Sequence, residues 1–200
     1  MGPVDEVLAL FAARGDDHFG EAIDQRRHAV QCALAAQARG AADALVAACL
    51  LHDIGHLLSD RLDDPEVDLA AVDDHHEVVG ARWIAPRFGA AVARPVALHV
   101  VAKRWRCTVD APYRATLSDA SRASLEAQGG LLDPAAVVRF ERSPGFADAV
   151  LLRECDEAAK DPSGPPGDLL PFVAIRPRRA TNGRRSTGAG GQTSGPPQTR

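Results

Sequence analysis

The segment that most constrains the fold is an almost uniformly apolar stretch at residues 42–58, ADALVAACLLHDIGHLL, which carries three ionisable side chains close together at His52, Asp53 and His56. Because a helix that is apolar all round belongs in an interior, we expect residues 42–58 to form the central helix of an all-α bundle. On such a helix His52 and His56 share a face, with Asp53 beside them. Burying three such groups is costly unless something binds them, although a solvent-exposed helix end is an alternative.

The flanking sequence also has helical periodicity, and no stretch alternates apolar and polar residues as a strand does. Apolar residues make up 46% of the chain but aromatic residues only 4%, so alanine, leucine and valine must fill the core of closely packed helices. An acidic loop is expected at 60–75. Further helices are expected at 7–11 with an end at Gly15, and at 22–38, 77–85, 91–104, 115–128, 134–140 and 146–160.

The composition changes abruptly after residue 160, which predicts a helical domain at 1–160 and a Gly/Pro/Arg-rich tail at 161–200. The tail holds seven glycines and seven prolines in forty positions. Such a segment buries too little apolar surface to offset its ordering entropy, so we expect it to be disordered. The sequence leaves open whether LLPFVAI at 169–175 docks on the domain.

The net charge, the cysteines and the absence of long apolar runs bear on whether the chain binds nucleic acid or membranes and on its cellular compartment. The net charge is −4, and six arginines against Asp161 and Asp168 in the tail leave −8 on residues 1–160, which disfavours nucleic-acid binding. Four cysteines without a C-x-x-C pair read as free thiols in a reducing compartment. The N-terminal stretch lacks the basic region of a signal peptide, so we expect none, and no apolar run approaches the ~18 residues of a membrane span. We therefore expect a cytoplasmic protein with no membrane partner; the oligomeric state is not predicted.

Further histidines and an aspartate outside the central segment can complete a metal site. His28 lies 24 residues before His52, which suits an antiparallel neighbouring helix, and His76, His99 and Asp156 lie in other predicted helices. Imidazole and carboxylate groups together are ligands for zinc, iron or manganese. Each histidine alone is more often a core residue with its hydrogen bonds satisfied. Together with the His-Asp pair they form a set, which predicts a metal site.

The order H…HD…D across helices resembles the HD superfamily, many of whose members are phosphohydrolases with one metal. Six further stretches follow in order along the chain: FGEAIDQRRHAVQCA (19–33), LLHDIGH (50–56), HEVVGARW (76–83), LHVVAKRW (98–105), LSDASRASLEAQGG (117–130) and LLRECDEAAKD (151–161). Together they closely resemble the phosphonate-degrading HD-domain oxygenases, relatives of myo-inositol oxygenase. The combination of HVVAKRW with LSDASRASLEAQGG is the most specific part of this resemblance.

The resemblance implies an HD-domain helical bundle with a dinuclear Fe(II)/Fe(III) site in its core and O2 as co-substrate. One metal would be held by His28, His52, Asp53 and Asp156. The other would be held by Asp53, His56, His76 and His99, so that Asp53 bridges the pair. His75 is an alternative to His76, which we prefer because the family histidine directly precedes a glutamate.

Several side chains are candidates for catalysis and for binding a small anionic substrate. Lys103 lies four residues after His99, and Arg153 lies three residues before Asp156, so both face the metal side of their helices. A solvated surface charge is the alternative for each. The resemblance assigns phosphonate contacts to Lys103, Arg153 and Ser121. We expect the catalytic residues to be Asp53, His56 and Lys103.

Glu21 and His18, which both precede His28 in the chain, are candidates for recognising the rest of the substrate. By resemblance, Glu21 would bind a substrate amino group, although an ordinary glutamate at a helix N-terminus is the alternative. His18 stands where some relatives carry a tyrosine that covers the iron. Cys155 stands where a tryptophan is expected, which would loosen the packing beside Asp156.

The resemblance implies oxidative cleavage of the carbon–phosphorus bond of a 1-hydroxy-(amino)alkylphosphonate, which gives phosphate and a carboxylic acid. The alternative is an HD-type metal-dependent phosphohydrolase acting on a phosphate ester or nucleotide, since a dinuclear site can also activate water. A regulatory HD module without catalysis is a third class. Iron content and oxygen consumption separate the first two hypotheses.

Overall fold

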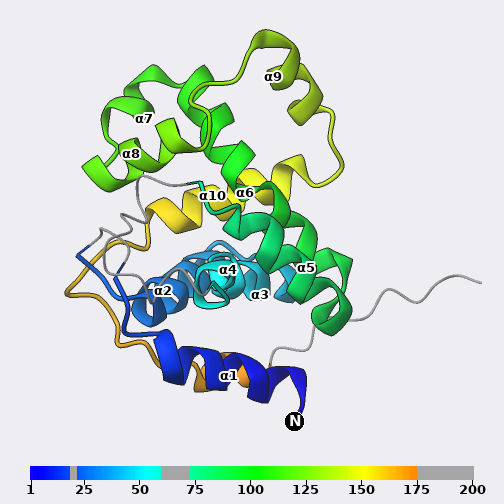
Figure 1. Cartoon of the computed structure of the whole chain (residues 1–200), viewed down its shortest axis with the longest axis vertical. Coiled ribbons are helices and arrows are strands. Elements are labelled where there is room, and N and C mark those ends of the chain that lie inside the picture. The colour runs from blue at the N-terminus through cyan, green and yellow to red at the C-terminus, as the bar shows by residue number, and fades with distance from the viewer. Residues whose placement is uncertain (19–21, 60–72, 175–200) are drawn as a thin grey trace, which may run out of the picture.

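The computed structural model describes residues 1–18, 22–59 and 73–174 (Figure 1), and every regular element in these ranges is a helix. The prediction of an all-α fold is therefore confirmed. The helices are α1 (Pro3–Arg14), α2 (Gln25–Ala38), α3 (Asp43–Leu51), α4 (Ile54–Leu57), α5 (His76–Phe88), α6 (Ala90–Val109), α7 (Ala111–Ala115), α8 (Asp119–Ala127), α9 (Pro134–Glu141), α10 (Phe146–Glu157) and α11 (Leu170–Val173).

The core is built around α3, which packs against α2, α6 and α10. Seven of its nine residues, Leu45 to Leu51, are buried. Small residues such as Ala33, Ala36 and Ala48 are completely buried, so the helix backbones approach closely. Figure 1 shows α2, α3 and α4 between α1 on one side and α6 and α10 on the other, with α7, α8 and α9 beyond α6.

The expectation of a single helix over residues 42–58 is wrong, because the helix breaks at His52 and Asp53. α3 ends at Leu51 and α4 begins at Ile54. Asp53 has φ −98° and ψ 10°, a sparsely populated conformation in which many active-site residues are found. The shared helical face inferred for His52 and His56 therefore does not exist. The turn brings both side chains toward Asp53 instead.

Other predicted boundaries also differ. Residues 115–128 are not continuous: α7 ends at Ala115 and α8 begins at Asp119, where the Ser118 hydroxyl accepts a hydrogen bond from the Ser121 N–H at 3.1 Å. That bond caps α8 and starts a new helix. The helix expected at 91–104 continues to Val109.

The first part of the predicted tail packs against the domain. The Gln31 side chain hydrogen-bonds both the Asp161 carbonyl, at 2.7 Å, and the Asp161 N–H, at 3.2 Å. Phe172 of α11 is buried in the main core cluster, and Figure 1 shows α11 beside α1. Residues 161–174 thus differ from the disorder expected of them, and the docking question is answered for Leu170–Val173. Residues 175–200 lie outside the described residues.

Replacing Phe172 by alanine should lower the free energy of unfolding by about 3 kcal/mol, because the change leaves a cavity in the core. Leu170→Ala is the matched control, since Leu170 is 71% exposed and on the same short helix. It should change stability by less than about 0.5 kcal/mol. Urea denaturation measures both, and equal effects would show that α11 contributes nothing to the core.

The cysteines agree with the expectation of free thiols. All four cysteines, Cys32, Cys49, Cys107 and Cys155, are buried free thiols. None of the helices in the described ranges has both the length and the apolar character that crossing a bilayer requires.

Candidate metal centre

The side chain of Asp53 lies between two groups of histidines, and each of its carboxylate oxygens faces one group. Oδ2 lies 3.3 Å from His52 Nε2 and 3.7 Å from His28 Nε2. Oδ1 lies 3.6 Å from both His76 Nε2 and His99 Nε2. This arrangement allows one carboxylate to bridge two cations.

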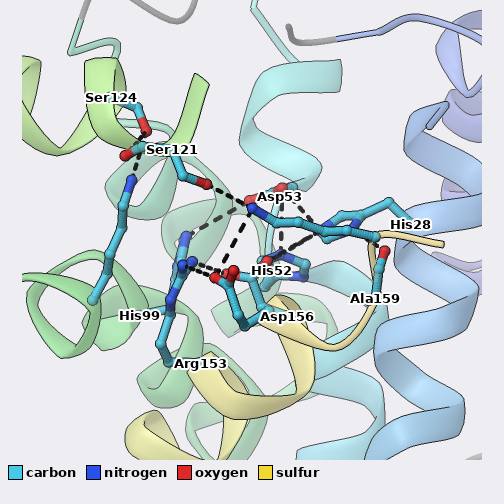
Figure 2. Close-up of polar contacts among 12 residues, drawn as sticks. His28, His52, Asp53, His99, Ser121, Ser124, Arg153, Asp156 and Ala159 are labelled. Carbon is cyan, nitrogen blue, oxygen red and sulfur yellow. Dashed lines mark hydrogen bonds and ion pairs between the residues drawn. The ribbon is translucent and has the colours of Figure 1, made fainter. Parts of the chain in front are cut away.

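The first group joins three helices. His28 comes from α2, His52 caps the end of α3, and Asp156 comes from α10. The Nε2 atoms of His28 and His52 are 3.3 Å apart, and Asp156 Oδ1 lies 3.4 Å from His28 Nε2. Figure 2 shows these side chains converging with Asp53. His28, His52 and Asp53 have the mutual spacing that a metal ion requires.

The second group joins α4, α5 and α6. The rings of His56 and His76 are stacked, with centroids 3.9 Å apart. The Nε2 atoms of His76 and His99 are 3.0 Å apart. Asp53, His56 and His76 again have the spacing of metal ligands. The structure therefore brings all seven predicted ligands together; their binding of metal stays a prediction.

Every histidine of the cluster has an acceptor opposite its Nδ1 atom, which fixes the tautomer. Three of them donate to backbone carbonyls: His28 to Ala159 at 2.8 Å, His52 to Cys49 at 2.8 Å and His99 to Val96 at 2.7 Å. His56 and His76 face the carboxylate of Asp74 at 2.7 and 2.9 Å. Since these partners only accept, Nδ1 carries the proton and Nε2 is left as a ligand atom directed at the cluster.

The charges of the cluster fit a cation. Burial alone would raise the pKa of Asp53, but His52 and the neighbouring histidines hold it well below its usual range. Burial opposes the charged form of His52 too, yet Asp53 raises the pKa of His52 to about 10. Burial, with His76 and His52 nearby, lowers the pKa of His99 to about 3. The site thus holds ionised carboxylates that share protons with buried imidazoles, and a cation can displace those protons.

The donor set narrows the class of metal. Five imidazoles and two carboxylates, with no thiolate among the clustered groups, suit iron, zinc or manganese rather than Cu(I). A buried cluster of this size would be destabilising without a bound ion. The residues present therefore fit a metal, and the spacing around Asp53 fits two.

A cavity of about 110 Å³ opens beside the cluster, and its opposite wall carries cationic and hydroxyl groups. Lys103 donates to Ser124 Oγ at 2.6 Å and to Gln128 Oε1 at 3.2 Å. Lys160 donates to Ser121 Oγ at 2.6 Å. Lys160 Nζ also lies 3.9 Å from Glu157 Oε2, whereas the hydrogen bonds of Lys103 go to neutral oxygens, so Lys103 offers positive charge for an anion.

Arg153 also lines the cavity, but protein oxygens already engage its guanidinium (Figure 2). Nη1 donates to Asp156, Nη2 to Glu157, and Nε to Tyr113 Oη at 2.9 Å. Its charge is balanced by two carboxylates, so its main effect is on Asp156. Only 4% of Arg153 and 6% of Lys103 are exposed, and the surface-charge alternative is therefore wrong for both.

The other predicted residues are placed differently. Ser121 lines the cavity, whereas His18 is exposed and is not part of the cavity wall. Glu21 lies outside the described residues. The side chain of His75 is 68% exposed and pairs with Asp73 at 3.3 Å, away from the cluster. The geometry thus favours His76 over His75 as a ligand.

Four residues of the site are not predicted from the sequence: Asp74, Ser124, Gln128 and Lys160. Ser124 lies three residues after Ser121 on α8, Gln128 is the C-cap of that helix, and Lys160 lies four residues after Asp156, beyond the end of α10. This helical spacing could have found them. Asp74 precedes His76 in the run DDHHE, and only that local cluster of charge marked it.

Comparisons with known proteins agree with this geometry. The sequence profile of the HD domain family matches residues 25–128. The chain is 44% identical over 161 residues to hydroxymethylphosphonate dioxygenase of Gimesia maris, covering 79% of this chain and 80% of that one. It is 35% identical over 162 residues to [1-hydroxy-2-(trimethylamino)ethyl]phosphonate dioxygenase (glycine-betaine-forming) of Leisingera caerulea, covering 78% and 80%. An uncharacterized protein of Acanthamoeba polyphaga mimivirus is 30% identical over 158 residues, covering 78% and 72%.

Proposed function

The chain belongs to the HD-domain family, in the group that contains these two phosphonate dioxygenases, and we propose that it is a cytoplasmic, iron- and O2-dependent oxygenase. It cleaves the carbon–phosphorus bond of a 1-hydroxyalkylphosphonate: one substrate and one O2 give one carboxylic acid and one phosphate. The observation that carries the proposal is the position of Asp53, whose two oxygens face two separate groups of histidines beside a cavity lined by Lys103 and Ser121.

An Fe(II)/Fe(III) pair, when bound, supplies the activation of O2 and the oxidation of the substrate carbon. The chain supplies positioning and charge. Lys103 neutralises the phosphonate, and the hydroxyl of Ser121 donates a hydrogen bond to one of its oxygens. Ser124 accepts from Lys103 and donates to the Ser121 carbonyl at 3.2 Å, so it positions the ammonium group. Lys160, which also lies 3.9 Å from Glu157, brings a second ammonium group to the Ser121 end of the cavity. Arg153 holds Asp156 in its ligating orientation.

We further propose that the substituent on the hydroxylated carbon is small and uncharged. Within the described part of the cavity wall, each carboxylate already pairs with a cationic or imidazole group: Asp53 with His52, Asp74 with His56 and His76, and Asp156 with Arg153. None of these carboxylates is available for a substrate ammonium group, and Glu21, which is predicted by resemblance to bind one, lies outside the described residues. Hydroxymethylphosphonate, the substrate named for one relative, fits this description.

Oxygen-dependent phosphate release tests the function. The protein is purified anaerobically with iron and supplied with hydroxymethylphosphonate, 1-hydroxy-2-aminoethylphosphonate and its trimethylammonium analogue. We expect one phosphate per O2 consumed, fastest with hydroxymethylphosphonate. Faster turnover of either amine would overturn the proposed substituent but not the reaction. Phosphate release from an ester such as p-nitrophenyl phosphate without O2 would instead establish the phosphohydrolase.

Lys103→Met should raise the KM for the phosphonate about ten- to a hundredfold, because a charge-assisted hydrogen bond contributes roughly 1.5–3 kcal/mol. Burial and the nearby Arg153 lower the pKa of Lys103 to about 8. The ammonium group is therefore charged below about pH 8 and is lost above it, so kcat/KM should fall as the pH rises past 8.

Steady-state kinetics across pH check this prediction. Lys103→Arg keeps its charge at high pH, so its kcat/KM should show no decline near pH 8. Arg82→Met removes an exposed positive charge elsewhere and should behave like the parent. Iron content should be unchanged in all three variants. An unaltered KM in Lys103→Met would remove Lys103 from the anion site.

A further inference from the structure

The carboxylate of Asp74 contacts two predicted metal ligands at once. Its Oδ2 accepts from His56 Nδ1 at 2.7 Å, and its Oδ1 accepts from His76 Nδ1 at 2.9 Å. Oδ1 also accepts from the backbone N–H of His76 at 3.1 Å. The side chain is only 7% exposed. Three donors thus hold Asp74 between α4 and the first turn of α5.

The backbone beside Asp74 is held in an uncommon conformation that makes these contacts possible. His75, which links Asp74 to His76, has φ 52°, the only positive φ of a non-glycine residue in the described ranges. A side-chain-bearing residue adopts this left-handed conformation at a cost, and persists in it where the surrounding contacts over-determine it. The hydrogen bonds that Asp74 accepts from both the ring and the backbone of His76 are such contacts.

The two halves of the cluster differ in these outer hydrogen bonds. His28, His52 and His99 donate to neutral backbone carbonyls. His56 and His76 donate to the charged carboxylate, which fixes their rings and raises the basicity of an imidazole more strongly than a carbonyl does. Asp74 therefore acts on one half of the cluster and on two ligands together.

We propose that Asp74 is a positioning residue that fixes the tautomers of His56 and His76 and so sets the affinity of their half of the centre for its cation. The inference rests on the proposed dinuclear function. It adds a specific role for a residue that does not itself coordinate metal.

Asp74→Asn isolates this role because asparagine has nearly the same shape. Its amide offers one acceptor oxygen and one NH2 donor, so it can accept from only one of the two imidazoles. The other ring meets a donor and either loses its hydrogen bond or moves its proton to Nε2, where the proton blocks ligation. Loss of such an outer partner typically weakens metal binding about ten- to a hundredfold.

The test is an anaerobic titration of the full-length, metal-free protein with Fe(II) against a competing chelator. The parent should bind two ions. Asp74→Asn should bind one with parental affinity and the other about ten- to a hundredfold more weakly. Asp73→Asn is the matched control. Asp73 directly precedes Asp74 in the chain, but it pairs with the exposed His75 and not with a predicted ligand. It should bind both ions as the parent does.

The outcomes separate this inference from the proposed function. If the parent binds a single ion, the dinuclear function is wrong and the inference is lost with it. If the parent binds two and Asp74→Asn binds both with unchanged affinity, only the role of Asp74 is overturned. Loss of both ions, or loss of the circular dichroism of the folded chain, would show a general structural role and would also overturn it.

Discussion

Asp53→Ala should remove both metal ions and reduce oxygen-dependent phosphate release below detection. The two oxygens of Asp53 face different ligand groups, so no other residue of the cluster can take its place. The negative charge of Asp53 also raises the pKa of His52, which shows that it attracts positive charge to that side of the cluster. Removing the carboxylate therefore weakens the electrostatic attraction for a metal cation there. Elemental analysis after anaerobic reconstitution with iron measures the loss directly.

His56→Ala provides the contrast, because His56 belongs to the second group alone. It should retain one iron, held by His28, His52, Asp53 and Asp156, and lose the oxygen-dependent reaction. One iron retained at full occupancy in Asp53→Ala would indicate a mononuclear centre. If activity also survived in His56→Ala, the reaction would not need a second metal.

Much of the site follows from the sequence because ligand spacing survives local changes of structure. The sequence predicts one helix that carries His52, Asp53 and His56. The helix breaks between them, and the three side chains still converge. Three side chains within five residues can reach one point from a helix or from a tight turn. The position of Lys103 was predictable for a simpler reason, since α6 is continuous through His99.

Asp74 could not be found in this way. It lies outside any helix and acts through a two-residue turn across His75. No periodicity marks such a position, and a run of acidic residues before a helix is ordinarily read as solvated. Its role depends on α4 and α5 lying side by side, which is a property of the tertiary fold.

The tail shows that average composition does not predict whether a short segment packs against the domain. Glycine and proline content predicts disorder from residue 161, but a few specific contacts dock part of this segment. Phe172 and Leu169 pack on the core. Gln31 hydrogen-bonds both backbone groups of Asp161, and Arg27 donates to the Pro162 carbonyl. An average over forty residues does not register contacts made by a few positions.

Gly55 of α4 lies in close contact with the backbone of His76 at the start of α5. A Cβ atom added to Gly55 would lie 2.7 Å from the carbonyl carbon and 2.8 Å from the Cα of His76, and closer still to the carbonyl oxygen. These are backbone atoms, so a rotamer change cannot relieve the overlap. Any side chain at position 55 must therefore push the start of α5 away from α4.

Gly55→Ala should accordingly lower the free energy of unfolding by about 3 kcal/mol or more, at the upper end of overpacking effects. Alanine favours a helix over glycine by about 1 kcal/mol, so the loss would occur against the local preference. The displacement carries His76 and Asp74 away from Asp53. The second iron should be lost while the first, held from α2, α3 and α10, is retained in the folded fraction.

Gly80→Ala is the matched control on the facing helix. Its added Cβ would meet Gly55 N at 3.2 Å and the Ile54 side chain at 3.4 Å, a tight fit that small shifts can relieve. It should cost about 1 kcal/mol and keep both irons. Urea denaturation together with iron content measures the two variants. If Gly55→Ala were as stable as the parent, α4 and α5 could separate without cost. The contact between Gly55 and the His76 backbone would then not hold His76 near Asp53.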